Sequence, residues 1–143
     1  MIFEEKDFIS IEEYKKVFIY FLIKNDEVVY VGKTTQGIFR PLSHRNKDYD
    51  KINIIYCDVD KSDKLESYYI LKYKPKYNKE LNYNSFYTMN MVVQKIKREI
   101  DFNFNLWRLK SIIKETQINI QEFNGKKYIS KDDFKEIIAY IRR

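Results

Sequence analysis

Cysteine, histidine, glycine and proline are scarce in this chain: its 143 residues include one Cys, one His, three Gly and two Pro. A single cysteine, Cys57, excludes an intrachain disulfide framework, and no Cys/His cluster offers a zinc site. No apolar run approaches the ~20 residues that a membrane-spanning helix requires. The N-terminus carries Glu4, Glu5 and Asp7 where a secretory signal peptide would be basic. These absences predict a soluble, cytoplasmic protein.

Charge and aromatic side chains are abundant instead. Residues 1–13 hold five acidic side chains and one Lys, so residues 14–143 carry 26 basic and 16 acidic groups, or +10. The chain also contains 13 Tyr, 10 Phe and one Trp. Cations with aromatic rings fit a nucleic-acid-binding protein, through phosphate contacts and base stacking. An AT-rich genome, which enriches Lys, Tyr, Ile, Asn and Phe in any protein, explains the same composition, so motifs must decide.

Apolar periodicity and turn signals predict strands and helices in the first half of the chain. The expected elements are a short helix capped by Ser10 and Glu13, a strand over Val17 to Lys24, a turn at Asn25-Asp26, a strand over Val28 to Gly32, a helix around Arg40 to Lys47 opened by Gly37, a strand over Ile52 to Asp58, and a helix that Asp60 or Ser62 caps and that ends before Pro75. The apolar side of this last helix is expected to comprise Leu65, Tyr68, Tyr69 and Tyr73.

The composition changes at residues 82–85, which divides the chain into predicted domains 1–85 and 86–143. The second domain is expected to run helix, helix, hairpin, helix. Its expected signals are helical spacing from Met89 to Ile100, a second helix from Leu106 to Glu115, an Asn124-Gly125 hairpin turn, and a closing helix capped by Ser130 with Asp133.

The stretch "VVYVGKT", Val28 to Thr34, ends like a phosphate-binding P-loop. A P-loop places a glycine-rich loop before its Lys, with a first glycine five residues before the second. Glu27 occupies that position, and Val28 to Val31 reads as strand. The P-loop interpretation therefore fails, and a strand carrying a Tyr, a Gly and a cation remains to be explained.

Six polar side chains of the first half have chemistry suited to phosphodiester hydrolysis. A single carboxylate can hold Mg²⁺, which keeps most of its waters and takes a phosphate oxygen. A guanidinium can fork onto the phosphate, and a phenol or an imidazole can move the proton of the attacking water. The candidates are Tyr20, Tyr30, Arg40, His44, Glu66 and Asn78, with Lys33 adding positive charge. Taken singly, each is more commonly a packing or surface residue, so their joint order carries the interpretation.

That order resembles the GIY-YIG nuclease family over roughly residues 17–81. "FIY" at Phe18 to Tyr20 stands for the first motif of the family and "YVG" at Tyr30 to Gly32 for the second. The further matches are Arg40 eight residues past that glycine, His44 four residues further on, Glu66 in "LESYYI" and Asn78 in "KPKYN". Two departures are Phe18, where the family has Gly, and a slightly short hairpin. Neither removes a reactive group.

The resemblance implies an α+β fold with a small central antiparallel sheet flanked by helices. It also implies that Glu66 binds Mg²⁺ or Mn²⁺, that Arg40 stabilises the phosphate, and that Asn78 supports the site more than it reacts. Either phenol could be the general base; we favour Tyr30, with Tyr20 and His44 in support.

The second half resembles the winged helix-turn-helix of excisionases and MerR-type regulators. The resemblance implies that the second helix enters the major groove with Arg108 and Lys110, and that Lys126 and Lys127 on the hairpin contact phosphates. A helical cap that completes the nuclease core is the structural alternative.

Together these observations predict a DNA endonuclease that leaves 5′-phosphate and 3′-hydroxyl ends on double-stranded DNA. One chain offers one active site, so a double-strand break requires a homodimer on DNA or successive cuts. The size and composition point to a phage or mobile element. A non-catalytic DNA-binding regulator on the same scaffold and an RNA-directed nuclease remain as alternatives.

Overall fold

The computed structural model describes residues 17–35 and 39–143, and the chain divides into two compact units. The first unit ends at Asn78 and the second begins at Lys79, a few residues before the boundary expected after residue 85. Each unit combines helices with a three-stranded antiparallel sheet. The coarse α+β class predicted from the sequence is therefore confirmed.

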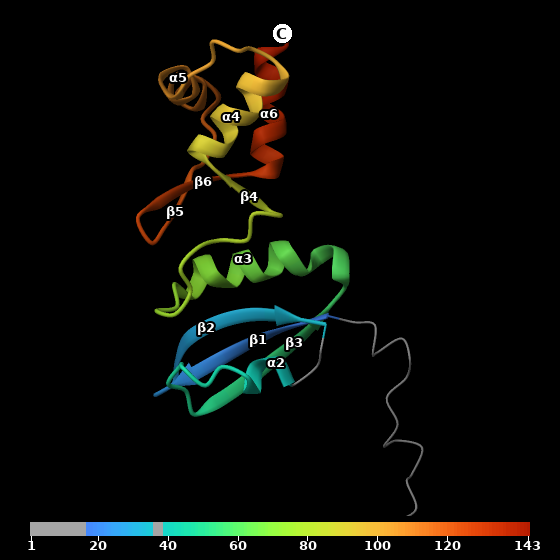
Figure 1. Ribbon diagram of the computed structural model, residues 1–143, viewed down its shortest axis with the longest axis vertical. Coiled ribbons are helices and arrows are strands. Elements are labelled where there is room, and N and C mark those ends of the chain that lie inside the picture. Colours follow the sequence, from blue (N-terminus) through green and yellow to red (C-terminus); the bar gives the residue numbers. More distant parts are fainter. Residues whose placement is uncertain (1–16, 36–38) are drawn as a thin grey trace, which may run out of the picture. The chain divides into compact units, whose positions relative to one another are not determined.

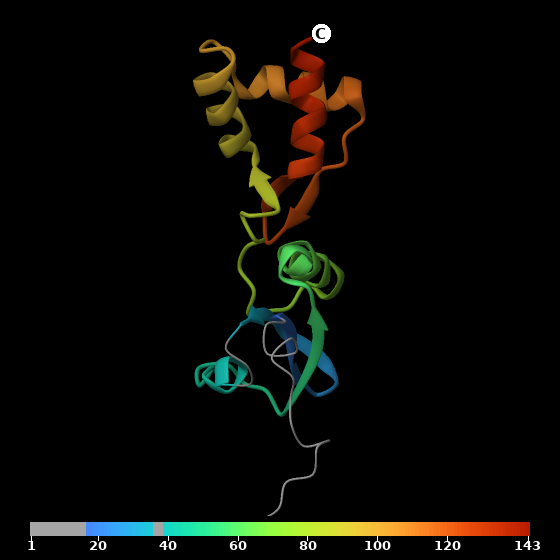
Figure 2. The same cartoon turned by 90° about the vertical axis from the view of Figure 1, so that its right-hand side faces the viewer.

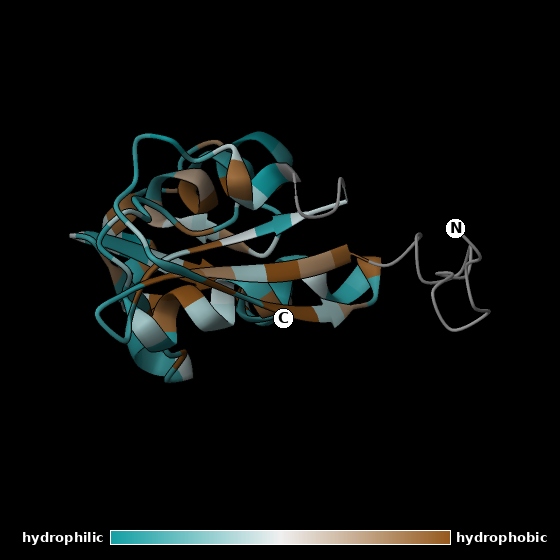
Figure 3. Cartoon of the chain, turned by 90° about the horizontal axis from the view of Figure 1, so that it is seen from below, coloured by the Kyte–Doolittle hydropathy of each residue, from teal (hydrophilic) through white to brown (hydrophobic). Residues whose placement is uncertain are grey.

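The first unit is a sheet of order β2-β1-β3 with a helix on each face (Figures 1 and 2). Its elements are β1 (Val17–Lys24), β2 (Glu27–Thr34), α2 (Phe39–Leu42), β3 (Lys51–Cys57), a 3₁₀ helix (Val59–Lys61) and α3 (Ser62–Tyr73). β1 lies in the centre because it is apolar along nearly its whole length, as the hydropathy colours of Figure 3 show, and its first six residues are buried. A strand covered on both faces needs such a continuous apolar run.

The tight hairpin between β1 and β2 follows from its two turn residues. Asn25 and Asp26 both have positive φ angles, 51° and 62°. Asn and Asp tolerate this left-handed conformation, and a turn of that kind matches the twist of the strands on either side. The turn aligns the strands so that Tyr20 pairs with Gly32 and Leu22 with Tyr30.

Successive side chains of β1 point to opposite faces of the sheet and so lie in two different environments. Phe21 meets α3, where its ring centroid lies 4.9 Å from that of Tyr69 and 6.1 Å from that of Tyr73. Phe18 and Tyr20 instead pack in a separate cluster with Leu22 and Val29 and with neighbours from β3. The candidate site is built on the Tyr20 side of the sheet.

Three expectations for the first unit were wrong. The helix expected around residues 40–47 ends at Leu42, because the backbone beyond it turns with bonds that reach back only two or three residues, as from Ser43 to Arg40 (3.2 Å) and from Arg45 to Ser43 (3.0 Å). Neither Asp60 nor Ser62 caps α3; its N-cap residue is Lys61, which makes no side-chain capping bond. The buried positions of α3 are Ser62, Ser67 and Ile70, whereas Tyr68 and Tyr73 are exposed. Two further expectations lie outside the described residues: the short helix capped by Ser10 and Glu13, and the opening of the helix around residues 40–47 at Gly37.

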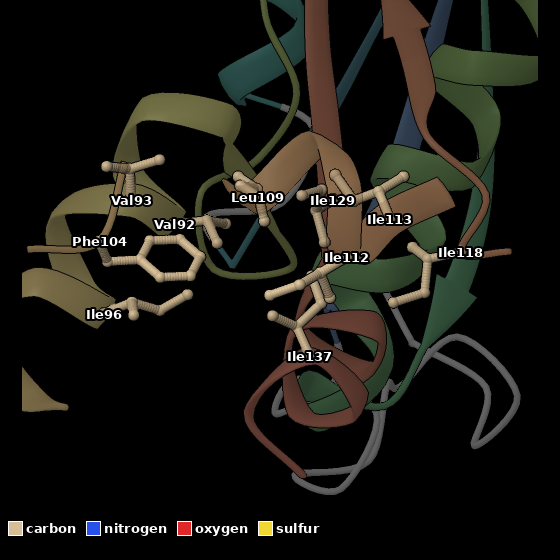
Figure 4. Close-up of a cluster of buried hydrophobic side chains, with 10 residues drawn as sticks. All are labelled: Val92, Val93, Ile96, Phe104, Leu109, Ile112, Ile113, Ile118, Ile129 and Ile137. Carbon is tan, nitrogen blue, oxygen red and sulfur yellow. The ribbon is translucent and has the colours of Figure 1, made fainter. Parts of the chain in front are cut away.

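The second unit gathers three helices around one end of a sheet of order β4-β6-β5. Its elements are β4 (Phe86–Thr88), α4 (Met89–Glu99), α5 (Leu106–Thr116), β5 (Gln121–Phe123), β6 (Lys126–Ser130) and α6 (Lys131–Ile141). The largest buried cluster of this unit that the structure describes is aliphatic around one aromatic ring, Phe104, and the helices and β6 contribute to it (Figure 4). The strand β4 was not predicted, because three residues are too few for an alternating pattern to show.

The predicted start and turn signals of the second unit are present. Ser130 accepts a hydrogen bond from the backbone N–H of Asp133 at the start of α6 (3.0 Å), as the capping pattern predicted. Asn124 and Gly125 have φ angles of 51° and 77°, which the hairpin turn requires. Local side-chain chemistry thus fixes where these elements begin and reverse.

Candidate active site

The two strand tyrosines lie side by side on one face of the sheet. Tyr20 pairs across the ladder with Gly32, and Tyr30 pairs with Leu22, so alternation brings both phenols to the same face. Their ring centroids are 6.0 Å apart and their hydroxyls share a hydrogen bond. The hairpin therefore supplies a pair of coupled phenols.

Gly32 provides the space that the Tyr20 ring occupies. A Cβ atom at position 32 would stand 2.4 Å from Tyr20 Cζ and 2.5 Å from Tyr20 Oη. Such distances are impossible without moving the ring, so no larger residue fits while Tyr20 keeps its place. Gly32 is therefore needed in "YVG" because it has no side chain to occupy the space of the Tyr20 ring.

His44 extends the phenol pair from the loop after α2. Its Nε2 lies 2.6 Å from Tyr20 Oη, and the side chain is only 7% exposed. On the other side of the ring, Lys47 Nζ lies 3.2 Å from His44 Nδ1. The same ammonium sits 4.8 Å from the centroid of the Tyr30 ring.

Lys47 determines the direction of these hydrogen bonds. An ammonium can only donate, so Nδ1 of His44 accepts and Nε2 carries the proton that it donates to Tyr20. Tyr20 is then free to donate its own proton to Tyr30. His44 therefore donates to the Tyr20 oxygen, and Tyr20 donates to the Tyr30 oxygen. His44 thus donates to the phenols in this tautomer, whereas the sequence interpretation gave it a shuttling role.

Burial and neighbouring charges lower the pKa of His44 and raise the pKa values of Tyr20 and Tyr30. Burial, with the positive charges of Lys47 and Arg40, lowers the pKa of His44, so the imidazole is neutral near pH 7. Burial is also the main reason why the pKa of Tyr20 is strongly raised. The pKa of Tyr30 is raised by burial and by the charge of Glu66, but the hydrogen bond with Tyr20 opposes that rise. The shared hydrogen bond thus raises the pKa of Tyr20 and lowers that of Tyr30, which favours ionisation at Tyr30.

Arg40 and Glu66 bring opposite charges to the phenol pair. Arg40 is exposed on α2, and its positive charge lowers the pKa of both Tyr20 and Tyr30. Glu66 is half-buried on α3, and its negative charge raises both. The structure therefore brings five of the six expected residues, Tyr20, Tyr30, Arg40, His44 and Glu66, into one electrostatic group.

Asn78 has a different position from the other five. Its Oδ1 accepts from the backbone N–H of Val31 (2.8 Å), and its Nδ2 donates to the Val31 carbonyl (2.9 Å). One amide side chain thus occupies both backbone groups on the outer edge of β2, next to Tyr30 and Gly32 in the chain. Tyr77 adds a backbone hydrogen bond to Val29 (3.0 Å) on the same strand. Asn78 holds the strand that carries the site.

A polar pocket adjoins the site on the side of Arg40. It measures about 360 Å³ and is lined by Val17, Lys33, Thr34, Thr35, Arg40, Val59 and Ser62. Lys33, which the sequence placed against phosphate, forms an ion pair with Asp63 of α3. The pocket brings two cations and several hydroxyls together and shares Arg40 with the group around the phenols.

The four candidate DNA contacts of the second unit lie on α5 and on the β5–β6 hairpin. Arg108 is already engaged: its Nη1 lies 2.7 Å from Asp101 Oδ2, and its guanidinium covers the Phe104 ring at 5.6 Å. Lys126 pairs with Glu80 at 3.5 Å. Lys110 and Lys127 are exposed and have no ion pair with any residue that the structure describes.

The donor set around Glu66 fits one hard cation that retains its waters. Within residues 17–35 and 39–143 no group of three His, Cys, Asp or Glu side chains could enclose a metal ion. Mg²⁺ does not need such a group, because it is commonly held by one or two carboxylates together with waters and substrate phosphate. Glu66 is half-buried beside phenolic oxygens and so could serve as that carboxylate.

No family model, curated protein or solved structure matches the chain. None of the helices in the described ranges is long and apolar enough to cross a bilayer.

Lys47 is the one residue of the site that sequence reasoning missed. It follows His44 by three positions in the basic stretch "HRNK", where nothing distinguishes it from Arg45. Its contacts depend on the path of the loop after α2, which no sequence pattern specifies.

Proposed function

We propose that the chain is a Mg²⁺- or Mn²⁺-dependent DNA endonuclease of the GIY-YIG type, with a winged-helix-like DNA-binding unit at its C-terminus. The observation that carries the proposal is the hydrogen-bonded series His44–Tyr20–Tyr30 between the charges of Arg40 and Glu66. A base, a guanidinium and a carboxylate in one group are the parts that phosphodiester hydrolysis requires. A packed core would have little use for that combination.

Tyr30 is the proposed general base. His44 donates to Tyr20 and Tyr20 donates to the Tyr30 oxygen, which stabilises the phenolate that takes a proton from the attacking water. The water oxygen bonds to phosphorus, the bond to the 3′ oxygen breaks, and this leaving oxygen takes a proton from solvent, so the products are a 5′-phosphate and a 3′-hydroxyl. Arg40 forks onto the phosphate and stabilises the charge that develops on its oxygens.

Glu66 is the proposed metal ligand. When bound, Mg²⁺ would polarise the phosphate and lower the pKa of the attacking water. Glu66 also keeps negative charge beside Tyr30, which makes the phenolate a stronger proton acceptor. In the adjoining pocket Arg40 offers positive charge to the neighbouring DNA backbone, and Lys33 can do so by exchanging Asp63 for a phosphate.

The second unit supports the DNA-binding part of the proposal. A β5–β6 hairpin follows α5 in the chain and pairs with β4, an arrangement compatible with a wing beside a recognition helix. Lys127 is free to contact phosphate, whereas Lys126 must exchange Glu80 for it and Arg108 must exchange Asp101 for a base edge.

Supercoiled plasmid incubated with purified protein, with and without Mg²⁺, tests the proposal. We expect nicking or linearisation only with the metal. Glu66→Ala should abolish cleavage but leave DNA binding nearly intact, since binding energy comes mainly from phosphate–cation contacts. Glu27→Ala is the matched control, because Glu27 is an exposed carboxylate at the start of β2.

Two results would replace the proposal by its alternatives. A wild-type protein that binds the plasmid but never cuts it would be a DNA-binding regulator. Cleavage confined to a parallel single-stranded RNA substrate would make it an RNA-directed nuclease. Wild-type rates from the Glu66→Ala protein would remove Glu66 from the site.

A further inference from the structure

Two aromatic side chains of the second unit point away from its core. Phe102 is 82% exposed and Trp107 is 78% exposed, the highest values among the large apolar residues that the structure describes. Phe102 lies in the turn between α4 and α5, and Trp107 lies in the first turn of α5. The fold itself makes little use of either ring, and exposing both to water has a cost.

The backbone around the two rings is held by specific hydrogen bonds. The Asp101 carboxylate accepts from the backbone N–H of Asn103 (3.0 Å) and from the Arg108 guanidinium (2.7 Å). Asn105 accepts from the backbone N–H of Arg108 (2.9 Å) and caps α5. Phe104, which lies between Phe102 and Trp107 in the sequence, is 1% exposed and anchors the turn in the core. The bonds to the backbone of Asn103 and Arg108, with the buried Phe104, therefore hold the turn that presents Phe102 and Trp107, also when the Arg108 guanidinium leaves Asp101.

The charges near the rings favour a polyanion as the partner. The second unit carries 13 Lys and Arg against 8 Asp and Glu, a net charge of +5. Lys97 Nζ lies 5.9 Å from the centroid of the Phe102 ring, and Lys110 follows Trp107 by three positions on α5. Neither lysine has an ion pair within the described part of the chain. An apolar protein partner would have to bury these charges, whereas a nucleic acid neutralises them.

We propose that Phe102 and Trp107 stack on unpaired bases of DNA, and that the second unit thereby prefers single-stranded or interrupted DNA to uninterrupted duplex. This inference deepens the proposed function and rests on DNA being the substrate. In a duplex the faces of the bases are covered by their neighbours, so exposed rings have little to stack on. Unpaired bases present free faces, and aromatic stacking on them tolerates any sequence.

Trp107 allows a direct test because it is the only tryptophan in the chain. The full-length protein is titrated in EDTA, where no cleavage occurs, with a single-stranded oligonucleotide, with a duplex carrying a single-stranded gap, and with the uninterrupted duplex. Stacking quenches indole emission, so we expect quenching with the first two DNAs at lower concentrations than with the third.

Variants separate stacking from charge. We expect Trp107→Ala and Phe102→Ala each to weaken binding of the single strand by between about 5-fold and about 150-fold, the range of one lost base–aromatic stack. The slope of log affinity against log salt should not change. Lys110→Gln should instead reduce that slope by about 0.7, the value for one lost phosphate contact on a single strand. Tyr68→Ala, which removes an exposed aromatic ring of the first unit, should leave both quantities unchanged.

Several outcomes would overturn the inference. They are unchanged Trp107 emission on a bound single strand, equal affinity for single strand and uninterrupted duplex, or wild-type affinity of both alanine variants. A protein-concentration-dependent emission shift without DNA would assign the surface to a second copy of the chain. Tighter binding of single-stranded RNA of the same sequence would overturn the assignment to DNA. Plasmid cleavage together with unchanged emission would refute only the stacking, whereas neither cleavage nor binding of any DNA would also refute the proposed function.

Discussion

Lys47 acts on the candidate base, Tyr30, in two ways, although no sequence motif includes it. It fixes the tautomer of His44, and it places a positive charge over the Tyr30 ring. Both effects favour the phenolate of Tyr30. A base of this kind becomes available as pH rises, because its pKa is raised by burial and by Glu66.

Cleavage should therefore accelerate from neutral to alkaline pH and level off once Tyr30 is ionised. Lys47→Met should move this profile to higher pH, since the phenolate loses a stabilising charge, and should lower the rate near neutral pH by about 5-fold, or ~1 kcal/mol of lost cation–ring interaction. Single-turnover rates across this pH range provide the measurement. Arg45→Met is the control, as Arg45 is exposed on the same loop. A parallel loss without any change in the profile would limit Lys47 to a structural role.

Gly32 and Tyr20 should behave as one unit in a double-mutant cycle. Gly32→Ala forces a Cβ into the Tyr20 ring and should lower the free energy of unfolding by about 1–3 kcal/mol, with loss of the Tyr20–His44 hydrogen bond. When Tyr20 is already Ala, the same change should cost almost nothing, because the ring that it meets is gone. Thermal melts of the four proteins give the coupling, and additive effects would contradict the proposed clash.

At the scale of the element, β2 depends on one side chain for its outer edge. Asn78→Leu removes both hydrogen bonds to Val31 and should destabilise the first unit by about 1–3 kcal/mol. Asn78→Asp keeps the acceptor for the Val31 N–H, so that hydrogen bond should survive. It loses the donor to the Val31 carbonyl and places a carboxylate there, so repulsion between the two oxygens should still destabilise the unit. Chemical denaturation measures both, with Asn46→Leu on the exposed loop as control. Equal stability of wild type and Asn78→Leu would show that the edge needs no clamp.

The elements that could be predicted are those with strong local signals. The strands β1 and β2 have apolar runs joined by Asn25-Asp26, and α6 has its Ser130 cap, so sequence and structure agree there. The end of α2 at Leu42 could not be predicted, because it depends on tight backbone turn bonds that no apolar pattern specifies. The buried side of α3 escaped prediction because two of its three buried residues are serines. The side chains of the site followed from motif spacing, but the contact of Lys47 depends on a loop path.

At the scale of the whole molecule, each unit has its own hydrophobic core. The cluster of Phe18, Tyr20, Leu22 and Val29 lies in the first unit, and the aliphatic cluster around Phe104 lies in the second. We therefore expect residues 79–143 to fold alone, with a cooperative thermal transition and dispersed amide NMR signals. Residues 1–78 should likewise fold but bind DNA more weakly and with a flatter salt dependence than the full chain. A molten fragment on either side would favour the alternative in which the second half is a structural cap on the first.

The clamp on β2 is also the last residue of the first unit. Asn78 grips Val31 through two hydrogen bonds, and the next residue, Lys79, already belongs to the second unit. Tension applied to the chain at Lys79 would therefore reach β2 first at Asn78 and next at the backbone hydrogen bond between Tyr77 and Val29 (3.0 Å). In mechanical terms Asn78 is an anchor point at the chain link between the two units.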